Sequence, residues 1–590
     1  MCTLRRSAPS SAALRSLSRR SKTSATASVS CPTRSNRRAL PMAKLAAPAA
    51  GTPETPTPEE LLTFLTDPRS YPHRPPQVRL VQTHASYVAL VPPWVYKVKK
   101  PVCLGFLDYS TLERRRYFIE REYVLNRRLA PGIYRRILPI TRGAGGALRF
   151  GGRGTPVEYA LQMRYIPEEW VLRFRLQQGR HSVRRSDIRR IVRHLVTHLY
   201  QGQSPGPEVS AWGTPERLRI STDENFEQTR PFLGLTISPL AYQIISAYTE
   251  AFYRHAAALL VRRVAENRIL ECHGDLHSEH IAYTERRILI YDCIEFNERF
   301  RCIDVANDIA FLAMDLDYYG YPELGAIAVE TAATLLQDPE LRFLADFYKC
   351  YRAYVRGKVE SMRARAPGIP EAERTQAQER ARRYFQLALR YATIGSQPTM
   401  LIIMGPIGSG KTTLARHLGE ELGWHVLSSD VVRKTLAGLP PFEPSPEWLR
   451  PWLYSPEMTR RTYRQLWESA LQLLQTHAGA IVDATFARRD LRDFFRHMAA
   501  RANARLLFVE LSAPMEVLRQ RVAGRRGKAV DSDAGIREFE RLAPRYEPPE
   551  ELPSEQLLTC QATVPSEELC ATILSELSHR QLQALTALLS

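Results

Sequence analysis

The stretch MLIIMGPIGSGKTT, residues 400–413, joins an apolar run to a glycine-rich loop. The run is typical of a buried strand, and the loop follows the pattern glycine, four residues, Gly-Lys-Thr. Leu414, Leu418 and Leu422 then keep a helical spacing. In a strand, loop and helix of this kind, glycines let backbone N–H groups surround a triphosphate, and the helix N-terminus adds the positive end of its dipole. The stretch therefore predicts a site for a nucleoside triphosphate.

The side chains of this loop have predicted roles in holding ATP and Mg²⁺. Lys411 is expected to reach the β- and γ-phosphates, and Thr412 is expected to offer its hydroxyl to Mg²⁺. The other predicted ATP-binding residues of the loop are Gly405, Gly408, Gly410 and Thr413. The pattern thus predicts ATP and Mg²⁺ as cofactors.

After residue 396, strand-like and helix-like segments alternate, which is typical of a parallel sheet covered on both faces. The expected strands are MLIIMG, WHVLSS, AIVDAT and RLLFVEL. Functional residues of such sheets lie at the C-terminal ends of the strands. Asp430 follows the second strand, with Arg433 one turn later, and Asp483 ends the third. Arg521 and Arg525 are four residues apart on a predicted helix and so share one face.

These residues resemble the small P-loop kinases, which include gluconate kinase, zeta-toxin-like kinases and the kinase part of polynucleotide kinase. The resemblance implies that Asp430 activates the acceptor hydroxyl and that Arg433 grips the acceptor. It also implies that Asp483 assists Mg²⁺ or acceptor placement and that Arg525, on a lid, neutralises the transferring phosphate. For Arg521 and Arg525, simple solvation on a helix surface is an open alternative.

Residues 271–310 hold a second set of polar residues with possible chemistry. His273-Gly-Asp275 precedes a strand-like pair, IAYTERRILIYD, and Asp292 closes that pair 17 residues after Asp275. Two carboxylates placed by a loop and by the end of a hairpin suit phosphoryl transfer. One can accept the proton of an attacking hydroxyl, while the other holds Mg²⁺.

The segments HGDLH (273–277), IYD (290–292) and DIA (308–310) resemble the aminoglycoside phosphotransferase family, whose fold is that of the protein kinases. The resemblance covers roughly residues 75–360. It implies that Asp275 is the catalytic base, that Asp292 is the metal aspartate and that Asp308 supports the loop.

The same resemblance extends to a lysine and a glutamate near the start of the folded chain. Lys97 resembles the strand lysine that binds the α- and β-phosphates, and Glu122 resembles its ion-pair partner in the next helix. Lys99 and Glu120 are close rivals for these two roles.

Two departures from the family pattern affect the expected activity. His280 stands where the family usually has an asparagine metal ligand; a neutral imidazole can bind a metal, although Mg²⁺ prefers oxygen. No glycine-rich phosphate flap lies between Val78 and Lys97. A kinase-shaped domain with weak or no nucleotide binding is therefore an alternative. A zinc site is a further one, although the spacing fits no standard finger or ribbon; its ligands would come from Cys272, His273, His277, His280, Cys293 and Cys302.

The whole chain of 590 residues predicts a mixed fold, α/β and α+β, in four parts. These are a basic tail (1–53), a kinase-like bilobal domain (54–360), a helical linker (361–395) and a P-loop domain (396–590). Within the second part we expect a helix from residue 57, strands in 78–100, a helix in 111–129, two strand arms about a glycine-rich turn in 149–165, and long helices in 188–199 and 240–265. The helix after residue 370 is expected to be a solvated connector, because its charges alternate in sign.

Charge and cysteine content bear on location and partners. The net charge is +20, but residues 1–53 hold ten basic and no acidic residues, while residues 396–590 hold 23 of each. A tail of this kind can bind polyanions without a specific site. Three interpretations stay open: a disordered tail or the product of a start site placed upstream of Met42, an organelle transit peptide, and a specific nucleic-acid arm. Nine cysteines without paired spacing favour a reducing cytoplasm, and no apolar run approaches the ~20 residues that span a membrane.

The combination of a phosphotransferase-like part with a P-loop kinase-like part resembles a bacterial family of that two-part order. We expect transfer of the ATP γ-phosphate to a hydroxyl of a small-molecule acceptor, with no membrane partner. The alternatives are a nucleotide-binding switch or toxin-type regulator, and a nucleic-acid end kinase. The balanced charge of residues 396–590 counts against the last.

Overall fold

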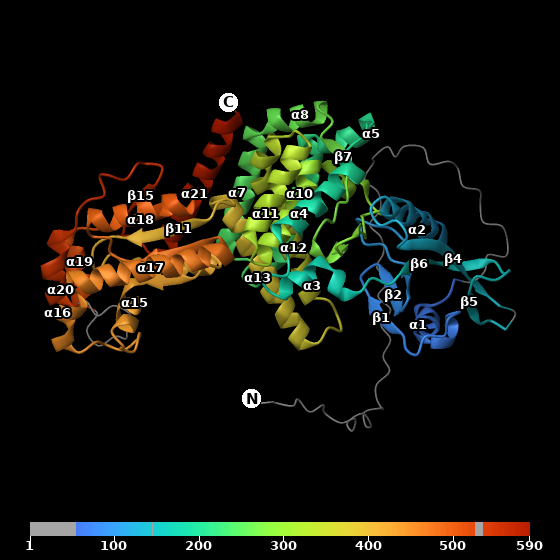
Figure 1. Cartoon of the computed structure of the whole chain (residues 1–590), viewed down its shortest axis with the longest axis horizontal. Coiled ribbons are helices and arrows are strands. Elements are labelled where there is room, and N and C mark those ends of the chain that lie inside the picture. The colour runs from blue at the N-terminus through green and yellow to red at the C-terminus, as the bar shows by residue number, and fades with distance from the viewer. Residues whose placement is uncertain (1–54, 144, 525–534, 590) are drawn as a thin grey trace, which may run out of the picture. The chain divides into compact units, whose positions relative to one another are not determined.

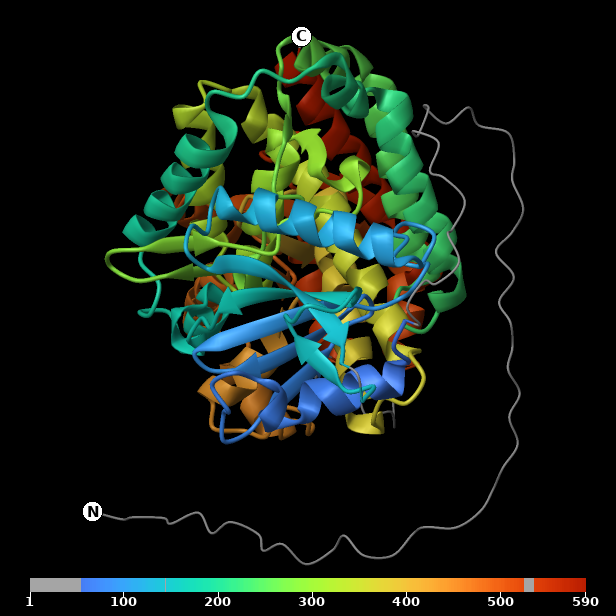
Figure 2. The same ribbon diagram turned by 90° about the vertical axis from the view of Figure 1, so that its right-hand side faces the viewer.

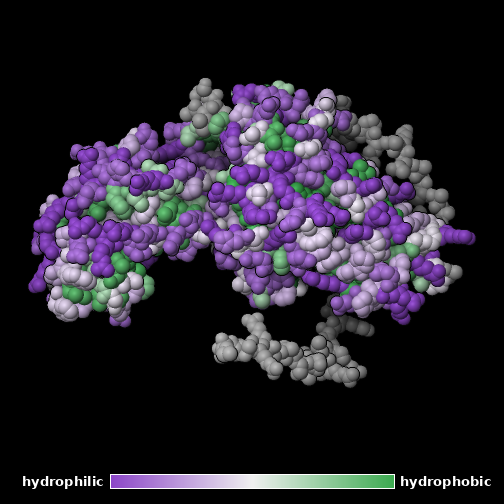
Figure 3. Space-filling model, in the orientation of Figure 1, coloured by the Kyte–Doolittle hydropathy of each residue, from purple (hydrophilic) through white to green (hydrophobic). Residues whose placement is uncertain are grey.

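The computed structural model describes residues 55–143, 145–524 and 535–589 (Figure 1), which belong to the unit Pro53–Ser590. The expectations for residues 1–53 and for Arg525 lie outside the described residues. Within the described part of the chain, no helix is both long and apolar enough to cross a membrane. Figure 3 shows a face on which hydrophilic residues dominate and apolar residues form separate patches.

The front half begins with a six-stranded antiparallel sheet whose strand order is β1-β2-β3-β6-β4-β5. Its strands are β1 (Arg79–Gln82), β2 (Ser86–Val91), β3 (Trp94–Lys99), β4 (Tyr134–Arg142), β5 (Leu148–Phe150) and β6 (Pro156–Arg164). Helices α1 (Pro58–Thr66) and α2 (Leu112–Arg127) cover opposite faces of the sheet (Figure 2). The alternation of side chains along β3 explains this, because Tyr96 and Val98 join the core under α1 while Lys97 and Lys99 point toward α2.

A helical region with two short antiparallel strand pairs follows. Its helices are α3 (Leu172–Gln177), α4 (Arg185–Leu195), the π-helical segment η3 (Val196–Tyr200), α5 (Pro207–Ser210), α6 (Pro215–Thr229), α7 (Pro239–His255), α8 (Ala257–Ala265), α9 (Glu298–Arg301), α10 (Val305–Tyr318), α11 (Pro322–Leu335), α12 (Glu340–Ala364) and α13 (Glu371–Thr393). The strand pairs are β7 (Ile269–Glu271) with β10 (Cys302–Asp304), and β8 (Ile281–Tyr283) with β9 (Ile288–Ile290). Every residue of α10 is buried, so this helix forms the centre of the region.

The C-terminal part is a five-stranded parallel sheet in the order β12-β13-β11-β14-β15 (Figure 1). Its elements are β11 (Thr399–Met404), α14 (Lys411–Leu422), β12 (Val426–Ser428), α15 (Ser429–Leu436), α16 (Arg450–Leu453), α17 (Pro456–His477), β13 (Gly479–Asp483), α18 (Arg489–Ala502), β14 (Arg505–Ser512), α19 (Met515–Ala523), α20 (Ile536–Leu542), β15 (Leu557–Gln561) and α21 (Ser566–Leu589). Parallel pairing places Ile403 and Ser428 beside Asp483, where these three strands have their C-terminal ends. This register is what brings the phosphate loop and the predicted carboxylates together.

Single 3₁₀ turns connect several of these elements. They are η1 (Pro68–Ser70), η2 (Glu168–Trp170), η4 (Ala211–Gly213), η5 (Arg230–Phe232), η6 (Ser278–His280), η7 (Glu447–Leu449) and η8 (Ala543–Arg545).

The mixed fold is confirmed, with an antiparallel sheet in front and a parallel sheet at the C-terminal end, but three local expectations are wrong. The two arms expected in 149–165 do not pair with each other, because β5 and β6 each pair with the unexpected strand β4. The helix expected over 240–265 is two helices that meet at Ala256. Finally, α13 is no solvated connector: its charged side stays exposed, while Tyr384, Phe385 and Leu389 lie in the main core.

That core runs without interruption from the helical region into the C-terminal part. It includes residues of α7, α10, α12 and α13 together with residues of β11, α14 and α21. The C-terminal part therefore shares its hydrophobic core with the helices that precede it.

Candidate functional site

The loop between β11 and α14 has a backbone that its glycines make possible. Gly405 has a φ of 137°, and a Cβ there would lie 2.3 Å from the carbonyl oxygen of Leu511. Gly410, with a left-handed φ of 89°, caps the N-terminus of α14. The Nζ of Lys411 donates to the carbonyl oxygen of Pro406 at 2.8 Å and thus folds back over the loop. This is the geometry expected of a loop that surrounds phosphate groups.

Thr412 and Asp483 form a pair of oxygen ligands beside the loop. The hydroxyl of Thr412 donates to Oδ2 of Asp483 at 2.6 Å, across the parallel strands that the register aligns. Burial raises the pKa of the Asp483 carboxyl above its usual value, while Lys411 and the hydrogen bond from Thr412 oppose that shift. A hydroxyl and a carboxylate at this place fit a Mg²⁺ ion, which takes oxygen ligands together with substrate phosphates.

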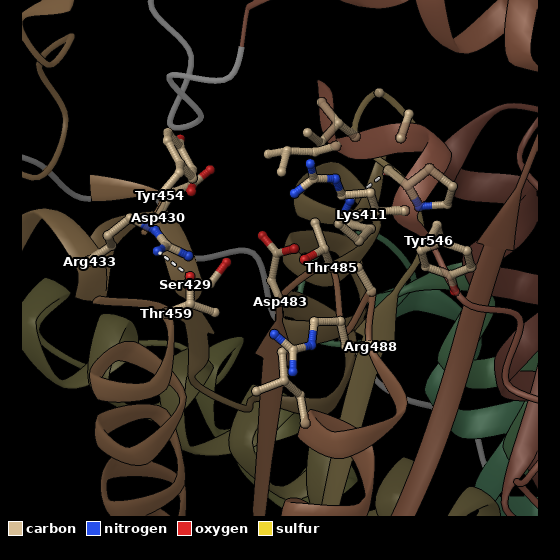
Figure 4. A pocket seen from close by; sticks show the side chains of 18 of the residues that line it. Lys411, Ser429, Asp430, Arg433, Tyr454, Thr459, Asp483, Thr485, Arg488 and Tyr546 are labelled. Carbon is tan, nitrogen blue, oxygen red and sulfur yellow. Dashed lines mark hydrogen bonds between the residues drawn. The ribbon is translucent and has the colours of Figure 1, made fainter. Parts of the chain in front are cut away.

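A cavity of about 260 Å³ opens directly from this loop (Figure 4). The predicted residues that line it are Gly408, Gly410, Lys411, Thr412, Thr413, Asp430, Arg433 and Asp483. Figure 4 shows Asp430 and Arg433 on one side, Lys411 on the other and Asp483 between them. Gly405 is not among the lining residues, because it packs against Leu511.

Arg433 is part of the cavity wall rather than a mobile surface group. Its Nη1 donates to the carbonyl oxygen of Leu453 at 2.8 Å and to the hydroxyl of Thr459 at 3.4 Å, and its guanidinium lies 4.9 Å from the ring centre of Tyr454. The side chain is buried, and its Nε has no hydrogen-bond partner. Its guanidinium is therefore a fixed positive charge in the cavity wall.

The sequence reasoning missed several cavity residues. They are Tyr454, Thr459, Tyr463, Thr485, Arg488, Arg545 and Tyr546. Thr485 and Arg488 follow β13 directly, so their position after a strand end was a usable signal. By contrast, Arg521 is exposed on α19 and does not line the cavity, and Arg525 lies outside the described residues.

The front half brings together a second group of predicted residues. Nζ of Lys97 lies 2.8 Å from Oε1 of Glu122 and 2.7 Å from Oδ1 of Asp292. Lys99 also pairs with Glu122, at 2.8 Å, and with Glu295. Both lysines reach one glutamate because alternate residues of β3 share a face.

Glu120 and Lys99, the alternatives for these two roles, have different surroundings from Glu122 and Lys97. Glu120 lies exposed and pairs with Arg116 at 2.9 Å, so it is not at this centre. Lys99 is enclosed by Glu122, Tyr109 and Glu295, whereas Lys97 is the lysine in contact with Asp292. The predicted pair of Lys97 and Glu122 therefore lies next to Asp292, the aspartate expected to bind the metal.

Asp275 lies within reach of two histidines. Its Oδ2 is 3.5 Å from Nε2 of His277 and 3.4 Å from Nδ1 of His280, whose Nε2 is 3.5 Å from Oδ2 of Asp292. Burial opposes ionisation of Asp275, but His277, His280 and Arg356 hold the pKa of its carboxyl well below the usual range. Lys97 and His280 likewise outweigh burial and lower the pKa of Asp292. Both aspartates are therefore carboxylates at neutral pH.

Asp308 fixes the loop that carries Asp275. It accepts hydrogen bonds from the backbone N–H of His273 at 2.8 Å and of Gly274 at 3.0 Å, and from the hydroxyl of Tyr200 at 2.8 Å. These contacts match the supporting role that the family resemblance implied.

The cysteines expected for a zinc site do not join the histidines. Among the described residues, the potential metal ligands that come within 4.8 Å of one another are Asp275, His277 and His280, and none is a cysteine. Cys272, Cys293 and Cys302 are buried free thiols. The zinc set considered from the sequence is therefore not assembled.

Together, the parallel sheet, the loop and the Thr412–Asp483 pair define a P-loop nucleotide-binding protein. Residues 400–549 match a protein family described as an AAA domain. The chain is 28% identical over 464 residues to uncharacterised proteins of Mycobacterium tuberculosis and Mycobacterium bovis; the match covers 78% of this chain and 89% of each relative.

Solved structures similar to the chain include a gluconokinase from Sinorhizobium meliloti 1021, 19% identical, which matches over 32% of this chain and 95% of its own, with a TM-score of 0.23. The Mycobacterium tuberculosis APS kinase in complex with AMPPNP and APS is 19% identical over 31% of this chain and 97% of its own, also with a TM-score of 0.23. TM-scores of this size carry no functional argument.

Proposed function

We propose that the protein transfers the γ-phosphate of ATP to a hydroxyl group of a small-molecule acceptor in the cavity beside the phosphate loop. The observation that carries this proposal is that one cavity joins Lys411 and Thr412 to Asp430 and Arg433. A nucleotide-binding loop alone would serve a switch equally well. A carboxylate and an arginine across the same cavity are what an acceptor hydroxyl needs.

In this reaction the residues of the chain have separate tasks. The loop amides and Lys411 hold the phosphates, and Thr412 and Asp483 would hold Mg²⁺, which neutralises charge that develops on the transferring group. Asp430 accepts the proton of the acceptor hydroxyl, and Arg433 orients the acceptor from the cavity wall through its guanidinium.

The dimensions and charge of this site favour a small acceptor. At about 260 Å³ the cavity is near the lower end of the roughly 300–1,000 Å³ typical of ligand pockets. The net charge of residues 396–590 is balanced, unlike the basic domains that commonly bind nucleic acids. Both facts argue against an end kinase for polynucleotides.

For the front half we propose a second, aminoglycoside phosphotransferase-like centre, with Asp275 as catalytic base and Asp292 and His280 as metal ligands. Its support is the contact of Lys97 with both Glu122 and Asp292, and the position of Asp275 next to His280. The alternative is a kinase-shaped module that recognises an acceptor or partner for the P-loop part.

Transfer of a radioactive label tests the main proposal. Full-length protein is incubated with ATP labelled at the γ-phosphate and with fractionated small molecules of a cell extract. We expect a labelled small molecule with the unmodified protein and none with Lys411→Ala. ATP binding without any labelled product would instead favour the nucleotide-binding switch, and a labelled nucleic acid would favour the end kinase.

A further inference from the structure

A second cavity, of about 440 Å³, lies at the meeting point of four helices. The C-terminal ends of α10, α14 and α17 border it at Tyr318, Leu422 and His477, and α13 passes along it with Arg383 and Arg390. All of these elements belong to the compact unit that shares the main core. None of the cavity's lining residues belongs to the P-loop cavity.

Three arginines give this second cavity an excess of positive charge. Arg180, Arg383 and Arg390 line it, and each donates to backbone carbonyl oxygens rather than to a carboxylate. The carboxylate that also lines the cavity, Asp317, is already neutralised by Lys349 at 3.0 Å. Three guanidinium groups thus line one cavity beside one carboxylate, Asp317, whose Oδ2 accepts from Lys349 and Tyr391 and whose Oδ1 has no hydrogen-bond partner. Arg180 and Arg383 are exposed, whereas Arg390 is buried.

Arg390 is the buried member of this group. It is only 3% exposed, yet its Nε has no hydrogen-bond partner. Its Nη2 donates one hydrogen bond, to the carbonyl oxygen of Ser396 at 3.0 Å. A buried guanidinium with one hydrogen bond is costly, so an anion that enters the cavity beside it would be stabilised.

Capping of the helix ends explains only part of the arrangement. Arg180 donates to the carbonyl oxygens of Gly320 and Gln475, and Arg383 donates to that of Tyr318 at 3.3 Å. A guanidinium has five N–H donors in a fork that matches phosphate oxygens, so most donors of these arginines stay available. Burial, His425, Arg383 and Arg180 also lower the pKa of His477, as a positively charged environment would.

We propose that this second cavity binds a phosphate-bearing small molecule, with Arg180, Arg383 and Arg390 as its phosphate ligands. Trp424, which is 6% exposed, and Tyr319 add aromatic surface to the wall. The phosphate group is the shared chemistry of inorganic phosphate, a nucleotide and a sugar phosphate, and any of these is a possible source.

The helices around the second cavity connect it to both chemical centres. Helix α14 begins at Lys411 and ends at Leu422 in this cavity, and α17 runs from the P-loop cavity to His477. The first turn of α10 carries Asp308, which fixes the loop of Asp275, and its last residue is Tyr318. A ligand bound here is therefore placed to change ATP affinity at the phosphate loop; this coupling rests on the proposed function, whereas the binding itself does not.

Titration of the full-length Lys411→Ala protein with inorganic phosphate, ADP and glucose 6-phosphate tests the binding. Asp292→Asn is also present, so that nucleotide binding is weakened at both proposed phosphoryl-transfer centres and calorimetry reports occupancy of the second cavity. We expect saturable binding of at least one probe and a loss of about ten-fold or more in affinity for Arg383→Gln, because a charged hydrogen-bond donor is removed. The preference among the three probes identifies the source of the phosphate.

Arg382→Gln is the matched control, since Arg382 is the neighbouring arginine on α13, is exposed like Arg383 and does not line the cavity. Its affinity for the probe should stay within about two-fold, the scale of a surface charge. Absence of saturable binding for all three probes would overturn the proposal, as would equal affinity in Arg383→Gln and the parent protein. Failure of label transfer by the unmodified protein would leave this result unaffected, so the two proposals fail separately.

Discussion

Replacement of Lys411 by alanine is expected to lower ATP affinity at the phosphate loop by about 10- to 150-fold. A hydrogen bond from a charged group contributes about 1.5–3 kcal/mol, and each 1.4 kcal/mol corresponds to a factor of ten in Kd. In the structure the Nζ of Lys411 lies over the loop, 2.8 Å from the Pro406 carbonyl oxygen, so it is positioned for the phosphates before they arrive.

The fold of the loop should survive this substitution. Gly405 donates its backbone N–H to the carbonyl oxygen of Thr485 at 3.3 Å, and Ser409 donates to that of Pro406 at 3.3 Å. Neither contact needs the Lys411 side chain. The melting temperature of Lys411→Ala should therefore match that of the unmodified protein in the absence of nucleotide.

The assay is calorimetry with a slowly hydrolysed ATP analogue and Mg²⁺ on the full chain. The full chain is necessary because α14 and α21 share the core of the preceding helices. Asp292→Asn is present in every sample to weaken binding at the front centre. Arg464→Ala, which removes an exposed arginine of α17 outside the cavity, is the charge control. Equal affinity in Lys411→Ala and Arg464→Ala would refute the assignment of the loop as the ATP site.

Three further predictions concern the front half, the first two measured with Lys411→Ala present so that the phosphate loop is silent. Asp275→Asn should reduce phosphoryl transfer by about 10²–10⁴-fold with nucleotide affinity little changed, whereas Asp292→Asn should also weaken Mg·ATP binding; identical effects would contradict the separate roles. His280→Asn supplies an oxygen ligand and should preserve or raise Mg²⁺-dependent activity, and a complete loss would show that the imidazole is required. Asp308→Ala should lower the free energy of unfolding by about 2–4 kcal/mol, because the two buried backbone N–H groups of the loop that carries Asp275 lose their acceptor. An unchanged midpoint in a denaturant titration would exclude this role.

The part of the site that the sequence predicts best is the part set by local pattern and strand register. The glycine spacing of residues 405–410 predicts a phosphate-binding loop. Asp430 follows a predicted parallel strand and Asp483 ends one, so both are expected at the C-terminal ends of the strands. Parallel pairing then brought Asp483 to Thr412 at 2.6 Å, as the rule on strand ends implies.

The remaining cavity walls come from segments that are far apart in sequence. Tyr454 precedes α17 and Tyr546 follows η8, and no short pattern connects them. Their association depends on the packing of α15, α17 and the chain after α20, which single-sequence periodicity does not encode. The second cavity is beyond sequence reasoning for the same reason, since its arginines lie on separate elements.

Local errors in the front half also have physical causes. Strand β4 carries Pro139 and three arginines, so it lacks the apolar alternation that indicates a strand. The break at Ala256 has no glycine or proline to announce it. In α13, alternating charges on one side concealed the aromatic and aliphatic side that joins the core.

The central claim is that Asp430 acts as the base for phosphoryl transfer in the cavity beside the phosphate loop. The direct measurement is the rate of label transfer from ATP to the acceptor fraction by Asp430→Asn, compared with Glu468→Gln, an exposed acid of α17 outside the cavity. The account predicts a rate lower by about 10²–10⁴-fold for Asp430→Asn, with ATP affinity within about two-fold of the unmodified protein, and an unchanged rate for Glu468→Gln. Transfer by Asp430→Asn at the unmodified rate would contradict it.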